Sequence, residues 1–235
     1  MKEKIIIATI KSWNILNAER FKELYKERYE TFIFTSNEEL TYKSLEKIAP
    51  QYIFFPHWSW IIPEDIYKNI DCVVFHITDL PYGRGGSPLQ NIILNKVYNT
   101  KISAIKVDGG IDTGNIYIKE DFHVGKGSAE EIFSRASEII LFKMIPYILE
   151  NDPIPYEQKG DVAKFKRRRH AESDMANASL KSINDFYDFI RMLDGEGYPN
   201  AYIKIGNYKI KFSDARIETE RVTGRFEVIS EDENA

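Results

Sequence analysis

Cysteine is nearly absent from this chain of 235 residues. The one cysteine, Cys72, cannot form an internal disulfide, and it leaves no cysteine-based metal site. His57, His123 and His170 lack the spacing of metal ligands, so we expect no metal ion. Because this composition fits a reducing compartment, we expect a cytoplasmic protein.

Long apolar runs are also missing. No stretch approaches the roughly 18 apolar residues that a membrane-spanning helix requires. The first ten residues lack the small-residue cleavage site of a signal peptide. The formal net charge of −4 gives no general attraction to nucleic acid or to an anionic membrane, so we expect neither as a partner.

Glycine does not occur in the first 82 residues, and this excludes two common nucleotide-binding loops. A Rossmann dinucleotide site needs G-x-G-x-x-G after the first strand, where this chain reads Lys11-Ser12-Trp13-Asn14. No G-x-x-x-x-G-K-[ST] phosphate loop occurs either. Six of the 13 glycines lie between Gly83 and Gly114, so we expect special backbone conformations in two loops, at residues 82–88 and 108–115.

Hydrophobic patterning predicts alternating strands and helices. Short apolar runs predict buried strands at residues 5–10, 32–34, 51–55 and 72–76. Amphipathic spacing predicts helices at residues 17–29, 41–48, 63–68 and 128–150. The last helix opens with a capping-box pattern, Ser128 with Glu131. This alternation predicts an α/β fold: a Rossmann-like parallel sheet with helices on both faces.

The rest of the chain predicts a small C-terminal appendage. We expect a catalytic domain at residues 1–155 and an appendage at residues 156–235, made of a linker, a helix and a β-hairpin. The helix is predicted at residues 183–193. Gly206-Asn207 is a strong turn signal between strands at residues 201–205 and 208–212, and a last strand is predicted at residues 225–229.

Two loops carry the residues most suited to chemistry. The first runs from His76 to Pro88 and reads H-I-T-D-L-P-Y-G-R-G-G-S-P. Ligands of open parallel sheets bind beyond the carboxyl ends of the strands, and His76 ends a predicted strand. The second loop, around Asp108-Gly109-Gly110-Ile111-Asp112-Thr113-Gly114, combines glycines with two acids.

Together these loops resemble the folate-dependent formyltransferases. That family shows H-x-S-x-L-P-x-x-R-G-x-x-P, with D-x-G about 36 residues after the histidine. Here His76, Thr78 in place of serine, Leu80-Pro81, Arg84-Gly85 and Pro88 match, and Asp112-Thr113-Gly114 follows at the right distance. The segment from Phe55 to Pro63 is similar to the family's folate-binding turn, and the resemblance covers roughly residues 1–170.

The resemblance implies roles for particular residues. His76 would be base or oxyanion donor, and Asp112 would orient it and help to remove the amine proton. The residues implied for the folate are Trp58, Ser59, Ile62, Asp108 and Gly109. The residues implied for the acceptor are Thr78, Arg84, Gly85 and Gly86. The family's usual asparagine, which helps to hold the formyl oxygen, is replaced here by Val74.

The sequence of the His76–Pro88 loop is similar to that of small bacterial sugar N-formyltransferases and of formylation domains of peptide synthetases. It implies transfer of formyl from N10-formyltetrahydrofolate to the amine of a UDP- or dTDP-linked 4-amino sugar, with the pseudaminic acid pathway favoured. The expected partners are thus a reduced folate and a nucleotide-linked amino sugar, and a homodimer through the hairpin is left open. The alternatives are a methionyl-tRNA formyltransferase-like enzyme, disfavoured because no extra basic domain is evident, and a non-catalytic folate- or sugar-binding module.

Several residues have a structural interpretation beside the functional one. Asp108 suits a turn former as well as a pterin contact, and Arg84 could brace its loop or contact an anion. Trp58 suits packing as well as ligand stacking. The basic run from Lys166 to Arg169 is typical of a solvated segment, with a place near phosphate groups as the alternative.

Overall fold

The structure is a computed structural model that describes residues 2–231, and it divides into two compact units. Unit 1 holds the described residues up to Gly85 together with Thr100–Phe122 and Phe133–Lys164. Unit 2 holds Gly86–Asn99, His123–Ile132 and the described residues from Phe165 onward. The chain therefore passes between the units several times. None of the described helices is long and apolar enough to cross a bilayer.

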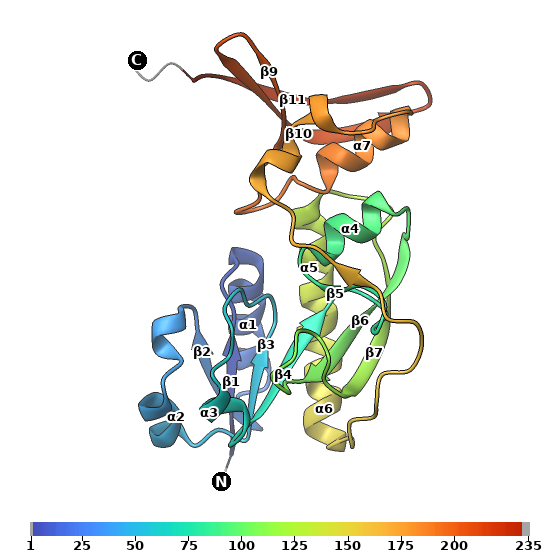
Figure 1. Cartoon of the computed structure of the whole chain (residues 1–235). Coiled ribbons are helices and arrows are strands. Elements are labelled where there is room, and N and C mark those ends of the chain that lie inside the picture. Colours follow the sequence, from blue (N-terminus) through green and yellow to red (C-terminus); the bar gives the residue numbers. More distant parts are fainter. Residues whose placement is uncertain (1, 232–235) are drawn as a thin grey trace. The chain divides into compact units, whose positions relative to one another are not determined.

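Unit 1 is built on a six-stranded sheet with the strand order β2-β1-β3-β4-β6-β7 (Figure 1). The strands are β1 (Glu3–Ala8), β2 (Tyr29–Phe34), β3 (Tyr52–Phe55), β4 (Asp71–His76), β6 (Asn99–Lys106) and β7 (Ile116–His123). The first four run parallel to one another, which confirms the α/β prediction for this part of the chain.

The predicted parallel sheet is extended by β6, a strand that the hydrophobic pattern did not predict, and β6 pairs with β4 in the antiparallel sense. A parallel pair needs a crossover connection, usually a helix packed on the sheet. The only helix between β4 and β6 in the described chain is α4 (Pro88–Leu94), and it belongs to unit 2. The crossover rule therefore does not constrain the direction of β6, and the sheet is mixed.

The helices of unit 1 follow the predicted pattern with shifted ends. They are α1 (Ser12–Leu24), α2 (Tyr42–Ile48), α3 (Glu64–Tyr67), α5 (Ala129–Ile139), which begins in unit 2, and α6 (Ile145–Asn151). Helix α1 starts earlier than predicted because Trp13 and Asn14 already face the core. Its predicted C-terminal end instead lies at the start of β2, and Leu24 is 67% exposed.

The long predicted helix at residues 128–150 is interrupted. Ser128 and Glu131 form the expected capping box at its start, through two backbone-to-side-chain hydrogen bonds of 2.8 and 3.2 Å. A π-turn at Ile140–Met144 then separates α5 from α6. Pro146 lies in the first turn of α6, and because proline has no N–H, the regular hydrogen-bond ladder cannot continue through it.

One apolar cluster fills one face of the parallel strands. Ile6, Ile53 and Phe55 pack there against Leu45 of α2 and Ile66 of α3. Because strand side chains alternate, Ile5 and Ile7 point to the other face, and both are fully buried. With both faces covered, the ligand-accessible part of unit 1 is the set of loops at the strand ends.

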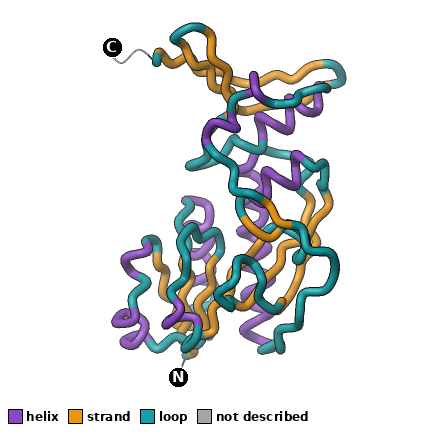
Figure 2. Tube along the Cα trace, in the orientation of Figure 1, coloured by secondary structure: helices purple, strands orange, loops and turns teal. Residues whose placement is uncertain are grey.

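Unit 2 contains α4, α7 (Ile183–Arg191) and a three-stranded antiparallel sheet in the order β11-β10-β9. The strands are β9 (Ala201–Ile205), β10 (Tyr208–Glu218) and β11 (Arg221–Ser230), drawn orange near the C-terminal end of the chain in Figure 2. The predicted hairpin is confirmed, with Tyr208 opposite Ile205 and Gly206 at φ +57°. Strands β10 and β11 are much longer than predicted.

The remaining elements of both units are short. They are η1 (Asn37–Glu39) and β5 (Arg84–Gly85) in unit 1, β8 (Lys164–Phe165) at the boundary, and η3 (His170–Ser173) and η4 (Met175–Asn177) in unit 2.

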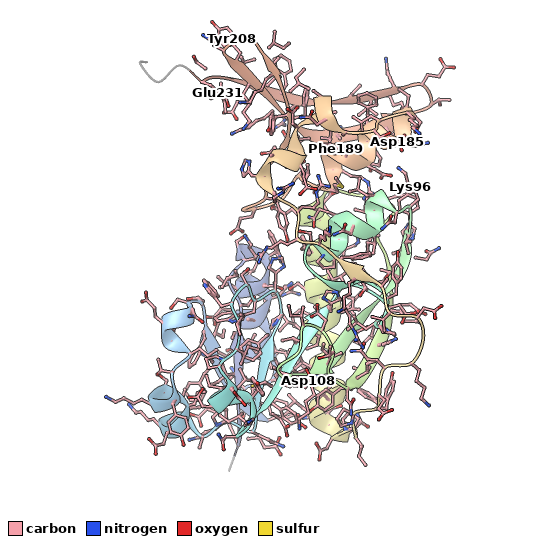
Figure 3. The ribbon with its side chains drawn as sticks, in the orientation of Figure 1. Lys96, Asp108, Asp185, Phe189, Tyr208 and Glu231 are labelled. Carbon is pink, nitrogen blue, oxygen red and sulfur yellow. The ribbon has the colours of Figure 1, made fainter. Side chains whose placement is uncertain are left out.

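A buried ionic network ties unit 2 together. Arg191 is 1% exposed, and its guanidinium donates to Asp188 at 2.7 Å and to the carbonyl oxygens of Val124 and Gly127. Lys96 donates to the same Asp188 at 2.9 Å (Lys96 is labelled in Figure 3). Residues far apart in the sequence are thus held around α7, which explains why two inner segments of the chain belong to this unit.

Candidate functional site

His76 is the last residue of β4, and its side chain is held by the loop that follows the strand. The side chain is 9% exposed, and Nε2 lies 2.8 Å from the carbonyl oxygen of Gly83. Nδ1 lies 3.5 Å from a carboxylate oxygen of Asp112. Both ring nitrogens therefore face oxygen atoms, one of a backbone carbonyl and one of a carboxylate. The predicted pair of His76 and Asp112 is brought together in unit 1.

Asp112 reaches His76 by way of its own loop. Strand β6 ends beside Val73, so its end does not lie beside His76. The loop after β6 adopts a turn in which Asp112 has φ +53°, in the left-handed region. The other carboxylate oxygen of Asp112 accepts from the backbone N–H of Gly85 at 2.8 Å. Asp112 thus joins the histidine to the loop that carries Arg84 and Gly85.

Gln158 fastens these two loops to each other. Its Nε2 donates to the carbonyl oxygens of Asp112 and Gly114, at 2.9 and 2.8 Å. Its Oε1 accepts from Nε and a terminal nitrogen of Arg84, at 3.0 and 2.8 Å. The side chain of Arg84 is therefore used for bracing in this structure. No sequence signal pointed to Gln158, which is a lone glutamine in a polar stretch.

The turn at residues 108–114 is specified by its acid and its glycines. Asp108 accepts from the backbone N–H of Gly110 at 3.0 Å and from the hydroxyl of Thr113 at 2.7 Å, which is the behaviour of a turn former. Gly109 has φ +88°, and a Cβ there would lie 2.6 Å from the Tyr67 hydroxyl. The exposed Asp108 is labelled in Figure 3.

The two segments implied for folate come together at the same apolar cluster. Ile62 is 8% exposed and belongs to that cluster, and Trp58 and Val107 pack against it. The ring of Trp58 lies edge-on to Trp60 at 4.8 Å between centroids, and its indole N–H is buried without a hydrogen-bond partner among the described residues. Ser59 is exposed. Ile62 is thus a core residue, while the indole N–H of Trp58 is able to donate a hydrogen bond to a ligand.

The remaining predicted residues lie in different surroundings. Thr78 is fully buried, and within the described chain its hydroxyl has no hydrogen-bond partner. Val74 packs against two apolar clusters, so its side chain is taken up by packing. Gly86 is the first residue of unit 2, where its N–H donates to the carbonyl oxygen of Phe165 at 3.3 Å.

Comparison with known proteins identifies the family. The chain is 52% identical to a solved methionyl-tRNA formyltransferase from Clostridium thermocellum, which covers 97% of this chain and 99% of that one with a TM-score of 0.93. The chain belongs to the formyltransferase family. A family model described as "Methionyl-tRNA formyltransferase, C-terminal domain" matches residues 170–229.

More distant relatives agree with this membership. A methionyl-tRNA formyltransferase from Syntrophomonas wolfei is 26% identical over 200 residues, which are 82% of this formyltransferase chain and 63% of the relative. The chain thus spans somewhat less than two thirds of that curated relative. HypX from Aquifex aeolicus, solved in complex with tetrahydrofolic acid, is 15% identical with a TM-score of 0.75 and covers 93% of this chain and 38% of that one, which shows a shared fold.

Two expectations from the sequence are corrected by these relatives. The likeness at 52% identity overturns the prediction of a nucleotide-linked amino sugar as acceptor, and with it the pseudaminic acid pathway. It also overturns the expectation that nucleic acid is not a partner. Net charge could not exclude a nucleic acid partner, because it is a sum over the whole chain, whereas phosphate binding depends on local charge. The segment interpreted as a mere appendage matches a C-terminal domain model of methionyl-tRNA formyltransferase.

Proposed function

We propose that this protein transfers the formyl group of N10-formyltetrahydrofolate to the α-amine of methionyl-tRNA. The observation that carries the proposal is the likeness at 52% identity to a methionyl-tRNA formyltransferase over nearly the whole chain. The site supports acyl transfer because a histidine, a carboxylate and backbone donors converge in one unit. A non-catalytic binding module would have no need for this pairing.

Formyl transfer requires two kinds of assistance. The donor supplies an activated formyl carbon, which the neutral amine attacks; the new carbon–nitrogen bond forms and the bond to N10 then breaks. The formyl oxygen becomes negative in between, while the attacking nitrogen becomes positive and must lose a proton. The proton lost by the amine must reach N10 as it leaves, so the site needs one group that donates to the formyl oxygen and one that takes the amine proton and passes it to N10.

His76 and Asp112 suit these two tasks. In the proposed mechanism, Nε2 of His76 leaves the Gly83 carbonyl and donates to the developing oxyanion, while Asp112 holds the ring from the Nδ1 side, accepts the amine proton and passes it to N10. Val74 cannot donate, so His76 carries the oxyanion without the asparagine that is usual in the family. Thr78 lies two residues after His76. Its buried hydroxyl has no hydrogen-bond partner among the described residues.

We assign the folate to the end of the apolar cluster where Trp58, Tyr67 and Val107 pack. The N–H of Trp58 and the exposed backbone of the Asp108-Gly109 turn would hold its polar edge. Ser59 is exposed beside Trp58, and Ile62 supports the turn from the core. A shared fold with a protein solved with tetrahydrofolic acid supports this assignment only at the level of architecture.

The basic run in unit 2 is the part that would meet the RNA backbone. Lys166, Arg167 and Arg169 are exposed, whereas Arg168 lies over the ring of Phe189 at 5.7 Å. Three of the four cations are therefore available to phosphates, and Arg168 has a packing role. Gly85 and Gly86 connect the site loop to this unit along the chain.

The proposal is tested by incubating the full chain with N10-formyltetrahydrofolate and methionyl-tRNA and measuring formylmethionyl-tRNA by mass spectrometry. We expect turnover that falls as salt rises, because each phosphate contact releases counterions. The variant with Lys166, Arg167 and Arg169 all changed to alanine should raise KM for the tRNA and flatten this salt dependence while leaving kcat nearly unchanged. Folate binding without any turnover would contradict the proposal, and so would formylation of free methionine as fast as methionyl-tRNA.

Gln158 gives a separate prediction about positioning. Gln158→Glu keeps the size and the acceptor for Arg84 but removes both donors to the turn that carries Asp112. We expect kcat to fall about tenfold, which corresponds to about 1.4 kcal/mol, because Asp112 is then less firmly placed. KM for the folate should change little. If Gln158→Ala and Gln158→Glu both keep full kcat, Gln158 has no positioning role.

A further inference from the structure

Strand β11 is the outer strand of the sheet in unit 2. It pairs with β10 on one side, and no other described strand pairs with its second edge. It is ten residues long, and an unpaired edge of this length is a template for another strand. Its largest apolar side chain, Phe226, is 70% exposed, and Val228 is 53% exposed.

Natural edge strands usually discourage pairing with charges that repel an incoming strand. The charges of β11 have a different pattern, because they complement a second copy of the same strand. In a two-fold antiparallel pair with the axis perpendicular to the sheet, each side chain stays on its own face. If Phe226 lies opposite itself, Arg225 lies opposite Glu227 of the second copy, and Arg221 lies opposite Glu231 of the second copy.

The neighbouring symmetric registers are unfavourable. Centring the pair on residue 225 would place Arg225 opposite itself, and centring it on residue 227 would place Glu227 opposite itself. Like charges directly opposite each other destabilise a pair of strands. Charge therefore favours the register centred on Phe226 over these two, and that register also places Val228 opposite the small Gly224.

The ion pairs within one chain strengthen this argument, because they extend into rows of alternating sign. Arg225 lies 3.0 Å from Asp214, and Glu227 lies 3.9 Å from Lys211. One row would then alternate in sign across the two-fold axis in the order Asp214, Arg225, second-copy Glu227, second-copy Lys211. A second row would alternate in the order Lys204, Glu231, second-copy Arg221, second-copy Glu218. Figure 3 labels Tyr208 and Glu231, which lie near each other at one end of this sheet.

We propose that two copies of this chain associate by antiparallel pairing of their β11 strands about Phe226, forming one continuous six-stranded sheet from two three-stranded ones. The pairing satisfies the unpaired backbone groups of both edges. It also covers Phe226 and Val228, which the single chain leaves exposed. The inference is independent of the reaction proposed above, because none of these residues belongs to the site in unit 1.

Sedimentation equilibrium of the full chain tests the association. We expect a dimer at micromolar concentration, and Phe226→Lys should make it a monomer because two added cations would meet at the axis. Ile205→Lys is the matched control: Ile205 is 58% exposed on β9, away from the proposed edge, so the dimer should persist. A wild-type chain that stays monomeric, or a dimer that survives Phe226→Lys, would overturn the proposal.

Cysteine cross-linking tests the register separately. Phe226→Cys places two thiols opposite each other, within the spacing of roughly 5.5 Å between Cα atoms that a disulfide needs. Val228→Cys places them four residues out of register, roughly 13 Å apart along the strands. The native Cys72 is 1% exposed and does not compete. We expect mild oxidation to cross-link Phe226→Cys only, and equal cross-linking of both variants would overturn the register.

Discussion

His76→Ala and Asp112→Ala are each expected to lower kcat by about 10²- to 10⁴-fold, the usual range for a general acid–base group. The two side chains lie 3.5 Å apart, so removing either one takes away the contact between imidazole and carboxylate. Groups that act as a unit are not additive, and the double variant should therefore be little worse than the worse single variant. Single-turnover kinetics with N10-formyltetrahydrofolate and methionyl-tRNA would measure both effects.

Asp108→Ala is the matched control for this pair. It removes a second acid of the same turn, which accepts hydrogen bonds from Gly110 and Thr113 of its own loop and lies outside the histidine pair. Its kcat should fall much less than that of Asp112→Ala, and folate affinity should change little in the His76 variant. Near-wild-type turnover in either single variant of the pair would refute the assignment and favour a binding module.

Local patterning was enough to predict most of the fold. The four parallel strands are apolar on both faces, and the sequence shows them as short unbroken hydrophobic runs. The capping box at Ser128 and the turn at Gly206 are likewise local features, and both are present. The antiparallel β6 could not be predicted this way, because its direction depends on a connection through α4, which packs in unit 2.

The candidate site shows the same division between local and distant information. His76 and Asp112 were found because the spacing of two loops resembles a family, and the structure places them together. The family spacing gives no physical reason for the meeting, and the structure supplies one: β6 ends beside Val73, and a turn with Asp112 at positive φ brings that residue to His76. Gln158 could not be found, since its role depends on contacts 44 to 74 residues away in sequence.

That turn depends on one glycine, and Gly114→Ala is accordingly the second change with a large expected effect. A Cβ at Gly114 would lie 1.6 Å from the carbonyl oxygen of Lys106, far inside any permitted contact. The neighbour is backbone of β6, so it cannot rotate away as a flexible side chain would. The turn must shift instead, and it carries Asp112 and the two carbonyl oxygens that accept from Gln158.

We expect Gly114→Ala to lower kcat by about 10²-fold, since a displacement of about 1 Å at a reacting group costs that much. The melting temperature should fall as well, because the strain acts on the start of β7. Gly206→Ala is the control: nothing lies within 4 Å of a Cβ there, so only the modest cost of its φ of +57° should appear and kcat should be unchanged. Circular dichroism below the melting temperature would confirm that the Gly114 variant is folded when it is assayed. If Gly114→Ala keeps wild-type kcat while its melting temperature falls, the turn supports stability alone and the geometry of Asp112 tolerates its displacement.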